Sequence, residues 1–160
     1  NLPAAKGISL VFVSAFLDNP ASLYGHLLVK FNTTAPHADH SLLSPTLNFG
    51  AVSDPEDSAV EYAVRGIFGG YDGVFSDERF YNFNHIYGDR ELRDLWEYPI
   101  RFTPEQRERI ARHAWELLQG LRFPYYFFLD NCAYRQAELL EMAWTTAPGS
   151  TRQGHSGPFR

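Results

Sequence analysis

Alternating apolar and polar residues predict β-strands in the first third of the chain. The apolar run Ile8–Leu17 is typical of a buried strand, and the turn cluster DNPAS follows it. The segment YGHLLVKF alternates, which places His26 on the opposite face from Leu27. PTLNFGAV alternates in the same way and places Asn48 on the opposite face from Leu47. We therefore expect a hairpin followed by a third strand.

Helical spacing and capping signals follow later in the chain. Apolar residues recur at helical intervals over Ser58–Phe68, and Gly69 ends that pattern. The string TPEQ supplies a capping box with Pro104 at the first helical position, which predicts a helix from Thr103 to about Gln119. Between these helices, residues 71–102 are rich in aromatic residues and glycine. This stretch predicts irregular loops and then a strand near residues 95–102.

Length and charge limit the classes of protein that the chain can belong to. A chain of 160 residues fits one compact domain, which we place at residues 1–146, with a flexible tail or linker at 147–160. The net charge of −5 argues against nucleic acid as the main partner. The longest apolar run is too short to cross a bilayer. The chain begins at Asn1 rather than a methionine, which indicates a processed protein or an excised domain.

The single cysteine, Cys132, is the leading candidate for a catalytic residue. It lies in FLDNCAYRQAELLEMAW, where an aromatic stretch changes into an amphipathic helix capped by Asp130 or Asn131. Unpaired backbone N–H groups in the first turn of a helix favour a thiolate, so this position suits a nucleophile. Free cysteines are also commonly buried as small apolar residues, and position alone does not separate the two roles.

A thiol nucleophile needs a base, and the chain has six histidines. Only His26 falls within a predicted strand, where it would be held rigidly, and Asn48 on the next strand could face the same side and orient it. Cys132, His26 and Asn48 would then form a catalytic triad. The alternative for His26 is a histidine satisfied within the core or at a sheet edge.

Other motifs favour ordinary structural roles. HADH (residues 37–40) has no accompanying metal-ligand spacing and is typical of a solvated loop, so we expect no metal. GGYDG (residues 69–73) lacks the lysine of a phosphate-binding loop and suits a mobile turn beside a cleft. Asp94 and Glu97 are balanced by Arg90 and Arg93, which predicts an exposed ionic face.

Five strings together resemble the N-terminal periplasmic domain of the Lnb-type bacterial proteins: YGHLLVKF, PTLNFGA, GGYDGVFS, RDLWEYPIRFTPEQ and YYFFLDNCAYRQAELLE. That family is similar to circularly permuted papain-like enzymes of the NlpC type and to lecithin:retinol acyltransferase. The resemblance implies an α+β fold in which an antiparallel sheet packs against helices, with the nucleophile at a helix N-terminus. It also implies Cys132 as nucleophile, His26 as base and Asn48 as orienting residue, with Tyr24, Gly25 and Asn131 supporting the site.

The function implied by the resemblance is acyl transfer in the bacterial periplasm. A phospholipid would donate an acyl chain to Cys132, and the N-terminus of a lipoprotein or peptide would accept it, with no cofactor. A membrane region outside these residues would bring the domain to its donor. The aromatic residues before Cys132 favour an amine over water as acceptor. Two alternatives stay open: a cysteine peptidase or amidase that acts on cell-wall peptides, and a binding module that has lost catalysis.

Overall fold

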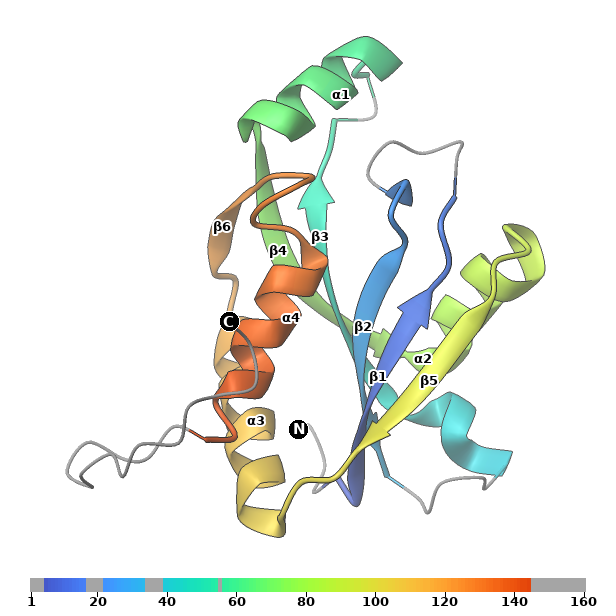
Figure 1. Cartoon of the computed structure of the whole chain (residues 1–160), viewed down its shortest axis with the longest axis vertical. Coiled ribbons are helices and arrows are strands. Elements are labelled where there is room, and N and C mark those ends of the chain that lie inside the picture. The colour runs from blue at the N-terminus through green and yellow to red at the C-terminus, as the bar shows by residue number, and fades with distance from the viewer. Residues whose placement is uncertain (1–4, 17–21, 34–38, 55, 145–160) are drawn as a thin grey trace, which may run out of the picture.

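The computed structural model describes residues 5–16, 22–33, 39–54 and 56–144. Within these residues, six strands form one antiparallel sheet in the order β5-β1-β2-β3-β4-β6 (Figure 1). The strands are β1 (Gly7–Val13), β2 (His26–Asn32), β3 (Pro45–Val52), β4 (Tyr71–Arg79), β5 (Leu95–Ile100) and β6 (Arg122–Tyr125).

Helices cover parts of both faces of this sheet (Figure 1). They are α1 (Ala59–Phe68), α2 (Phe80–Phe83), α3 (Pro104–Leu117) and α4 (Cys132–Glu141), with a 3₁₀-helix, η2 (Asp39–Leu43), and a π-helix, η3 (Asn84–Arg90). Helices α3 and α4 pack on one face, and α2 and η3 pack on the other. The α+β class with an antiparallel sheet is therefore confirmed.

Strand alternation sorts the core into two clusters. Val29, Phe31 and Leu47 point toward α3 and α4 and form the larger cluster with residues such as Leu139. Val11 and Leu28 point the other way and form a smaller cluster, which contacts α2 and η3. Lys30 is buried on that second face, where its Nζ donates to Glu97 Oε2 at 2.8 Å and lies 4.2 Å from the centre of the Phe80 ring. The neutralised charge explains how a lysine can lie inside the sheet.

The capping signals are confirmed. Thr103 and Gln106 form the reciprocal capping box of α3, with Pro104 at its start, although the helix ends at Leu117 rather than at Gln119. Ser58 and Glu61 form a second capping box at α1. The strand predicted from PTLNFGAV is β3 over the whole segment.

Three predictions about local structure are wrong. Residues 71–79 are not an irregular loop but β4, which pairs with β3 along its length and with β6 at one end. The following aromatic stretch is helical in α2 and η3. Asp94 and Glu97 do not belong to a uniformly exposed ionic face, because Glu97 pairs with Lys30 and Arg93 is buried. The tail proposed from residue 147 onward lies outside the described residues.

Helix α1 packs against the loop that leads to α4. Its apolar residues Val60, Val64 and Phe68 are exposed, and contact is made instead through Gly66 and through Tyr62, whose ring centre lies 5.3 Å from that of Phe127. The backbone N–H of Phe127 donates to the carbonyl of Gly66 at 2.9 Å, and a Cβ added at Gly66 would overlap the Phe127 ring. A glycine at this position therefore lets α1 hold the segment that precedes Cys132.

We predict that Gly66→Ala destabilises the fold by about 1–3 kcal/mol, because the added methyl overpacks against an aromatic ring. Gly88→Ala is the matched control, since its Cβ would meet only ordinary contacts at 3.6 Å or more. Urea denaturation followed by fluorescence gives both values. Equal stability of the two variants would contradict the proposed packing.

Candidate active site

Asn131 fixes the start of α4 and so places Cys132 at the first position of the helix. The Asn131 Oδ1 accepts from the backbone N–H groups of Ala133 and Tyr134 at 3.0 and 3.2 Å. Its Nδ2 donates to the carbonyl of Phe127 at 3.1 Å, which ties the cap to the preceding loop. The predicted N-cap is thus confirmed, with Asn131 rather than Asp130 in that place.

The thiol of Cys132 is buried, with the residue only 7% exposed. Burial raises the pKa of the Cys132 thiol, while backbone N–H groups of Leu27, Ala133 and Cys132 itself act in the opposite direction. The helix-start position alone suggested a thiol already inclined to ionise. The structure corrects this expectation, because desolvation outweighs the backbone dipoles. A thiolate here requires a base that removes the proton.

His26 is bound to Asn48 through its side chain. The imidazole Nε2 lies 2.6 Å from Asn48 Oδ1, and Asn48 Nδ2 donates to Ser76 Oγ at 3.3 Å. Because an amide oxygen only accepts hydrogen bonds, Nε2 carries the proton of the neutral ring. The lone pair is then on Nδ1, which is the nitrogen free to act as a base. His26 is the first residue of β2 rather than a mid-strand residue as the sequence suggested.

Strands β2 and β3, which carry His26 and Asn48, stop pairing near these two residues. Only Val29 and Lys30 of β2 pair with β3, so beyond Val29 the two strands are joined by the bond between the His26 and Asn48 side chains. Helix α4 packs on both strands. The Leu27 backbone N–H lies close enough to the Cys132 thiol to lower its pKa by hydrogen bonding, which places the thiol beside the residue next to His26. One turn along α4, Gln136 Nε2 donates to the carbonyl of Leu47 at 3.1 Å.

Tyr87 and Arg93, which the sequence did not single out, complete the surroundings of the imidazole. The Tyr87 ring meets that of His26 edge-on at 5.9 Å, and Arg93 lies 4.9 Å from the Tyr87 ring centre. Burial raises the pKa of Tyr87 to about 12, with an ionised Cys132 adding to the shift. Burial also lowers the pKa of His26 to about 4, and Arg93 lowers it further while the Asn48 bond opposes the change. Both Cys132 and His26 are therefore neutral near pH 7.

Arg93 is held by Ser14 and Glu91. Its Nε donates to the Ser14 carbonyl at 2.7 Å and its Nη1 to Glu91 Oε2 at 3.0 Å. Its Nη2 is buried and has no hydrogen-bond partner within the described part of the chain. The sequence around residue 93 shows only alternating charges, which are typical of exposed segments. The burial of Arg93 could therefore not be predicted from it.

Two further predicted supporting residues lie in the loop before β2. Tyr24 is 75% exposed and meets Phe128, from the loop before α4, edge-on at 5.8 Å. Gly25 has a φ of +92°, and a Cβ there would lie 2.6 Å from the Val13 carbonyl oxygen. Glycine is thus required immediately before His26.

The other histidines lie elsewhere or cannot be assigned. His85 contacts Asp89, and His113 contacts Glu116 on the surface of α3. His37 and His155 lie outside the described residues, as does the side chain of His40. Within the described residues there is no group of three or more His, Cys, Asp or Glu that could hold a metal ion.

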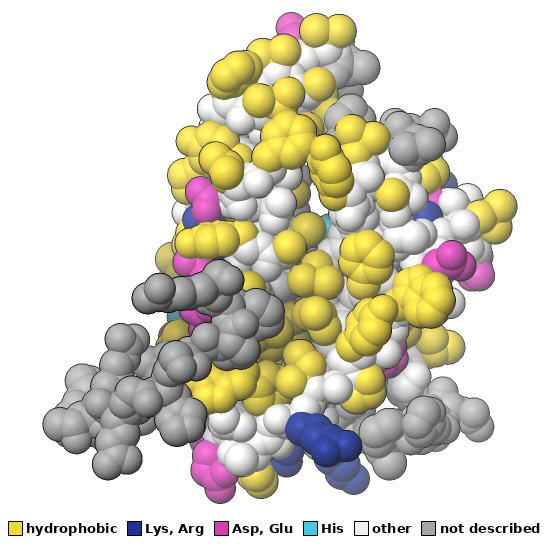
Figure 2. Space-filling model, in the orientation of Figure 1, with side chains coloured by type: hydrophobic (Ala, Val, Ile, Leu, Met, Phe, Trp, Pro, Cys, Tyr) yellow, Lys and Arg dark blue, Asp and Glu magenta, His cyan; other side chains and the backbone are white. Residues whose placement is uncertain are grey.

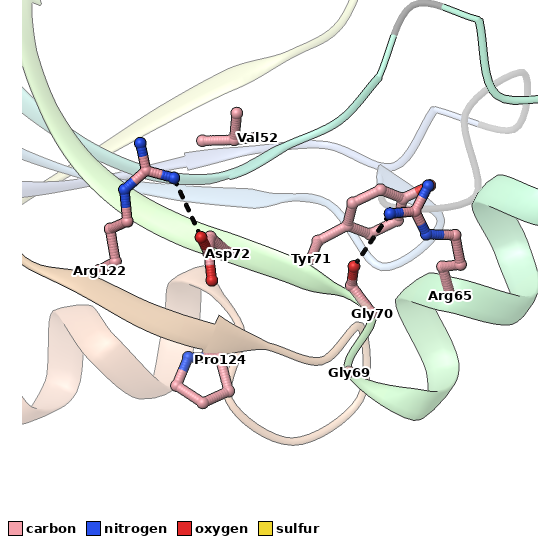
Figure 3. Close-up of a pocket in the computed structure, with 8 residues that line it drawn as sticks. All are labelled: Val52, Arg65, Gly69, Gly70, Tyr71, Asp72, Arg122 and Pro124. Carbon is pink, nitrogen blue, oxygen red and sulfur yellow. Dashed lines mark hydrogen bonds and ion pairs between the residues drawn. The ribbon is translucent and has the colours of Figure 1, made fainter.

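An open pocket of about 380 Å³ lies beside β3, β4 and β6, and its lining includes Val52, Tyr71 and Pro124 (Figure 3). Arg122 pairs with Asp72 across it at 3.0 Å, and Arg65 reaches the Gly70 carbonyl at 3.4 Å. Gly69 and Gly70 of the GGYDG motif border this pocket, but the motif is not a turn throughout, because β4 begins at Tyr71. None of Cys132, His26 and Asn48 lines this pocket.

Comparison with known families identifies the chain. The family model for the Lnb N-terminal periplasmic domain matches residues 3–159, and the chain belongs to that family. This is a periplasmic domain, and none of the helices in the described residues is long and apolar enough to cross a membrane. Searches of curated proteins and of solved structures gave no significant match.

The low pKa of His26 predicts a loss of stability in acid. The unfolded chain binds a proton at His26 below about pH 6.5, whereas the folded protein resists protonation until about pH 4. Stability is therefore lost as pH falls through this window, by about 3 kcal/mol in total.

Urea unfolding at about pH 7 and about pH 4 should show this loss in the natural protein and a smaller loss in His26→Gln. His113→Gln on the surface of α3 is the control and should behave like the natural protein. An identical pH dependence of all three proteins would mean that His26 is not the responsible group.

Proposed function

We propose that this domain is a thiol acyltransferase, in which Cys132 accepts a fatty acyl group and passes it to an amine such as a lipoprotein N-terminus. The observation that supports it best is the hydrogen bond from His26 Nε2 to Asn48 Oδ1 at 2.6 Å. That bond leaves Nδ1 free as a base, while the Leu27 N–H holds the thiol beside the same strand. Membership of a periplasmic family agrees with a substrate from the cell envelope.

In the first half-reaction, His26 Nδ1 takes the proton of the Cys132 thiol as the sulfur attacks the carbonyl carbon of an ester-linked acyl chain. The carbon–oxygen ester bond then breaks, and the protonated imidazole gives its proton to the leaving alcohol. A thioester remains on Cys132 and His26 is neutral again. Asn48 keeps Nε2 protonated throughout, which maintains the required tautomer.

In the second half-reaction, a neutral amine attacks the thioester carbonyl. His26 Nδ1 accepts the proton lost by the amine and returns it to the departing sulfur, so that an amide forms and the thiol is restored. Every atom and proton is accounted for by donor, acceptor, Cys132 and His26. The mechanism therefore needs neither a metal nor a cofactor.

A buried and apolar thiol suits transfer to an amine better than hydrolysis. Cys132 is 7% exposed, and Tyr24 and Phe128, from the loops that precede His26 and Cys132, make an aromatic contact. Restricting water lengthens the life of a thioester, which then waits for its acceptor. The order of the chain, with the histidine strand before the cysteine helix, also agrees with a circularly permuted papain-like enzyme.

The direct test is to incubate the domain with phospholipid and with either a diacylated lipopeptide or a cell-wall stem peptide. Mass spectrometry should find a fatty acyl adduct on Cys132 that the lipopeptide amine discharges faster than water does. Cys132→Ala should abolish the adduct, and His26→Ala should slow its formation by about 10²–10⁴-fold. His113→Ala is the control histidine.

Two outcomes would reject acyl transfer. Cleavage of the stem peptide without lipid labelling would make the domain a peptidase or amidase. An adduct that forms equally well in His26→Ala would remove the histidine from the mechanism and favour a binding module with an incidentally reactive thiol.

Asn48→Ala should shift the acid limb of the pH–rate profile to lower pH. The Asn48 bond raises the pKa of His26, so its loss lowers that pKa and shifts the acid limb of kcat/KM to lower pH. The rate at neutral pH should also fall, because the tautomer is no longer fixed. An unchanged pH profile with a lower rate would assign Asn48 a purely structural role.

A further inference from the structure

Among the described residues, no helix covers a strip of the sheet beside α4. On the face that carries α3 and α4, Phe12 pairs with Leu27 on one side and with Trp96 on the other, and Leu10 pairs with Tyr98. Trp96 and Tyr98 are 55% and 54% exposed. Figure 2 shows hydrophobic side chains gathered over this part of the sheet, with a hollow between it and the side of the molecule that carries α1 and α4.

An apolar stripe of α4 forms the facing wall. Ala133, Ala137, Leu140 and Trp144 recur at helical spacing, and only Leu140 is partly buried, whereas the other three are exposed. Trp144 contacts Phe102, just beyond β5, with ring centres 5.6 Å apart. On the other side of the helix, Arg135 lies over the Phe123 ring of β6. The stripe therefore faces β1 and β5.

These two walls define the α4–β5 groove, bounded by Leu10, Phe12, Leu27, Trp96 and Tyr98 on the sheet and by the α4 stripe. Neither wall contains a charged residue. One end lies at Leu27, whose N–H bonds the Cys132 thiol, and the other lies at Trp144. From Cys132 to Glu141, the last residue of α4, the helical rise amounts to about 14 Å. One leaflet of bilayer hydrocarbon, about 15 Å, has a similar length.

We propose that the α4–β5 groove binds the hydrocarbon of a long-chain acyl group, with its carbonyl at Cys132 and its methyl end toward Trp144. This inference rests on the proposed acyltransferase function and adds the place and direction of the chain. A peptide fits less well, because the named walls offer only the indole N–H of Trp96 and Trp144 and the Tyr98 hydroxyl as polar groups. Trp96 and Tyr98 on one wall and Ala137 on the other are exposed, so a chain can enter sideways from a lipid surface.

The test measures binding without chemistry, in the Cys132→Ala protein. Stearate brominated at mid-chain or near its methyl end is titrated while tryptophan fluorescence is followed, because bromine quenches only indoles that it approaches. Trp115→Phe removes the tryptophan on α3, which leaves Trp96 and Trp144. We expect both acids to quench, and the methyl-end bromine to quench Trp144 more strongly than the mid-chain bromine does.

Ala137→Phe should fill the groove without disturbing the core, because Ala137 is exposed. The affinity for stearate should then fall by at least about tenfold, since each buried methylene contributes roughly a factor of four. Glu138→Phe is the matched control on the same helix and should bind as before. Butyrate, which is too short to reach Ala137, should be unaffected by either change.

The outcomes separate this inference from the proposed function. Quenching that Ala137→Phe abolishes supports the groove even if no transfer to an amine is found. No quenching, or equal quenching in Ala137→Phe and Glu138→Phe, overturns the groove. If the groove test fails in this way but Cys132 is still acylated, the proposed transferase function stands and the acyl chain binds elsewhere.

Discussion

The separation of β2 from β3 determines how the candidate site is built. Where the strands stop pairing, their backbone groups need other partners, because unpaired polar groups are costly inside a protein. Two residues of α4, one turn apart, provide them: the Cys132 thiol receives the Leu27 N–H, and Gln136 donates to the Leu47 carbonyl. The bond between His26 and Asn48 spans the same gap. The helix docks where the sheet opens, and this brings its first residue beside Leu27, the neighbour of His26 in β2.

The burial of Cys132 and His26 also has an electrostatic consequence. It raises the pKa of Cys132 and lowers that of His26, so both groups favour their neutral forms. A resting thiolate–imidazolium pair would require the opposite shifts. Under the proposed function, proton transfer would then accompany attack on the substrate rather than precede it. A neutral thiol reacts slowly with stray electrophiles, which suits a site that has to wait for an acyl donor.

Local signals in the sequence were sufficient for the start of α4 and for the capping box of α3, because caps depend on residues within one turn. The other features of the fold and site depend on long-range packing, which local sequence patterns do not predict. Strand β4 contains Gly73 at an inward position, where a Cβ would overlap the Phe49 ring, and the glycine weakened its alternation. Since β4 leads into η3, missing it also hid Tyr87. The inner face of α4 contains a polar residue, Gln136, which is buried because it bonds a strand carbonyl.

Because side chains alternate along each strand, the two faces of the sheet differ in character. His26 and Asn48 lie on the face with Lys30 and Arg93, where hydrogen bonds and ion pairs satisfy polar groups. The opposite face is apolar and carries the α4–β5 groove. Under the proposed function, proton transfer and chain binding would therefore take place on opposite sides of β2 and meet at Cys132, the first residue of α4. A single helix position then couples the two, since any shift of α4 along β3 would move the thiol away from the base and the groove wall together.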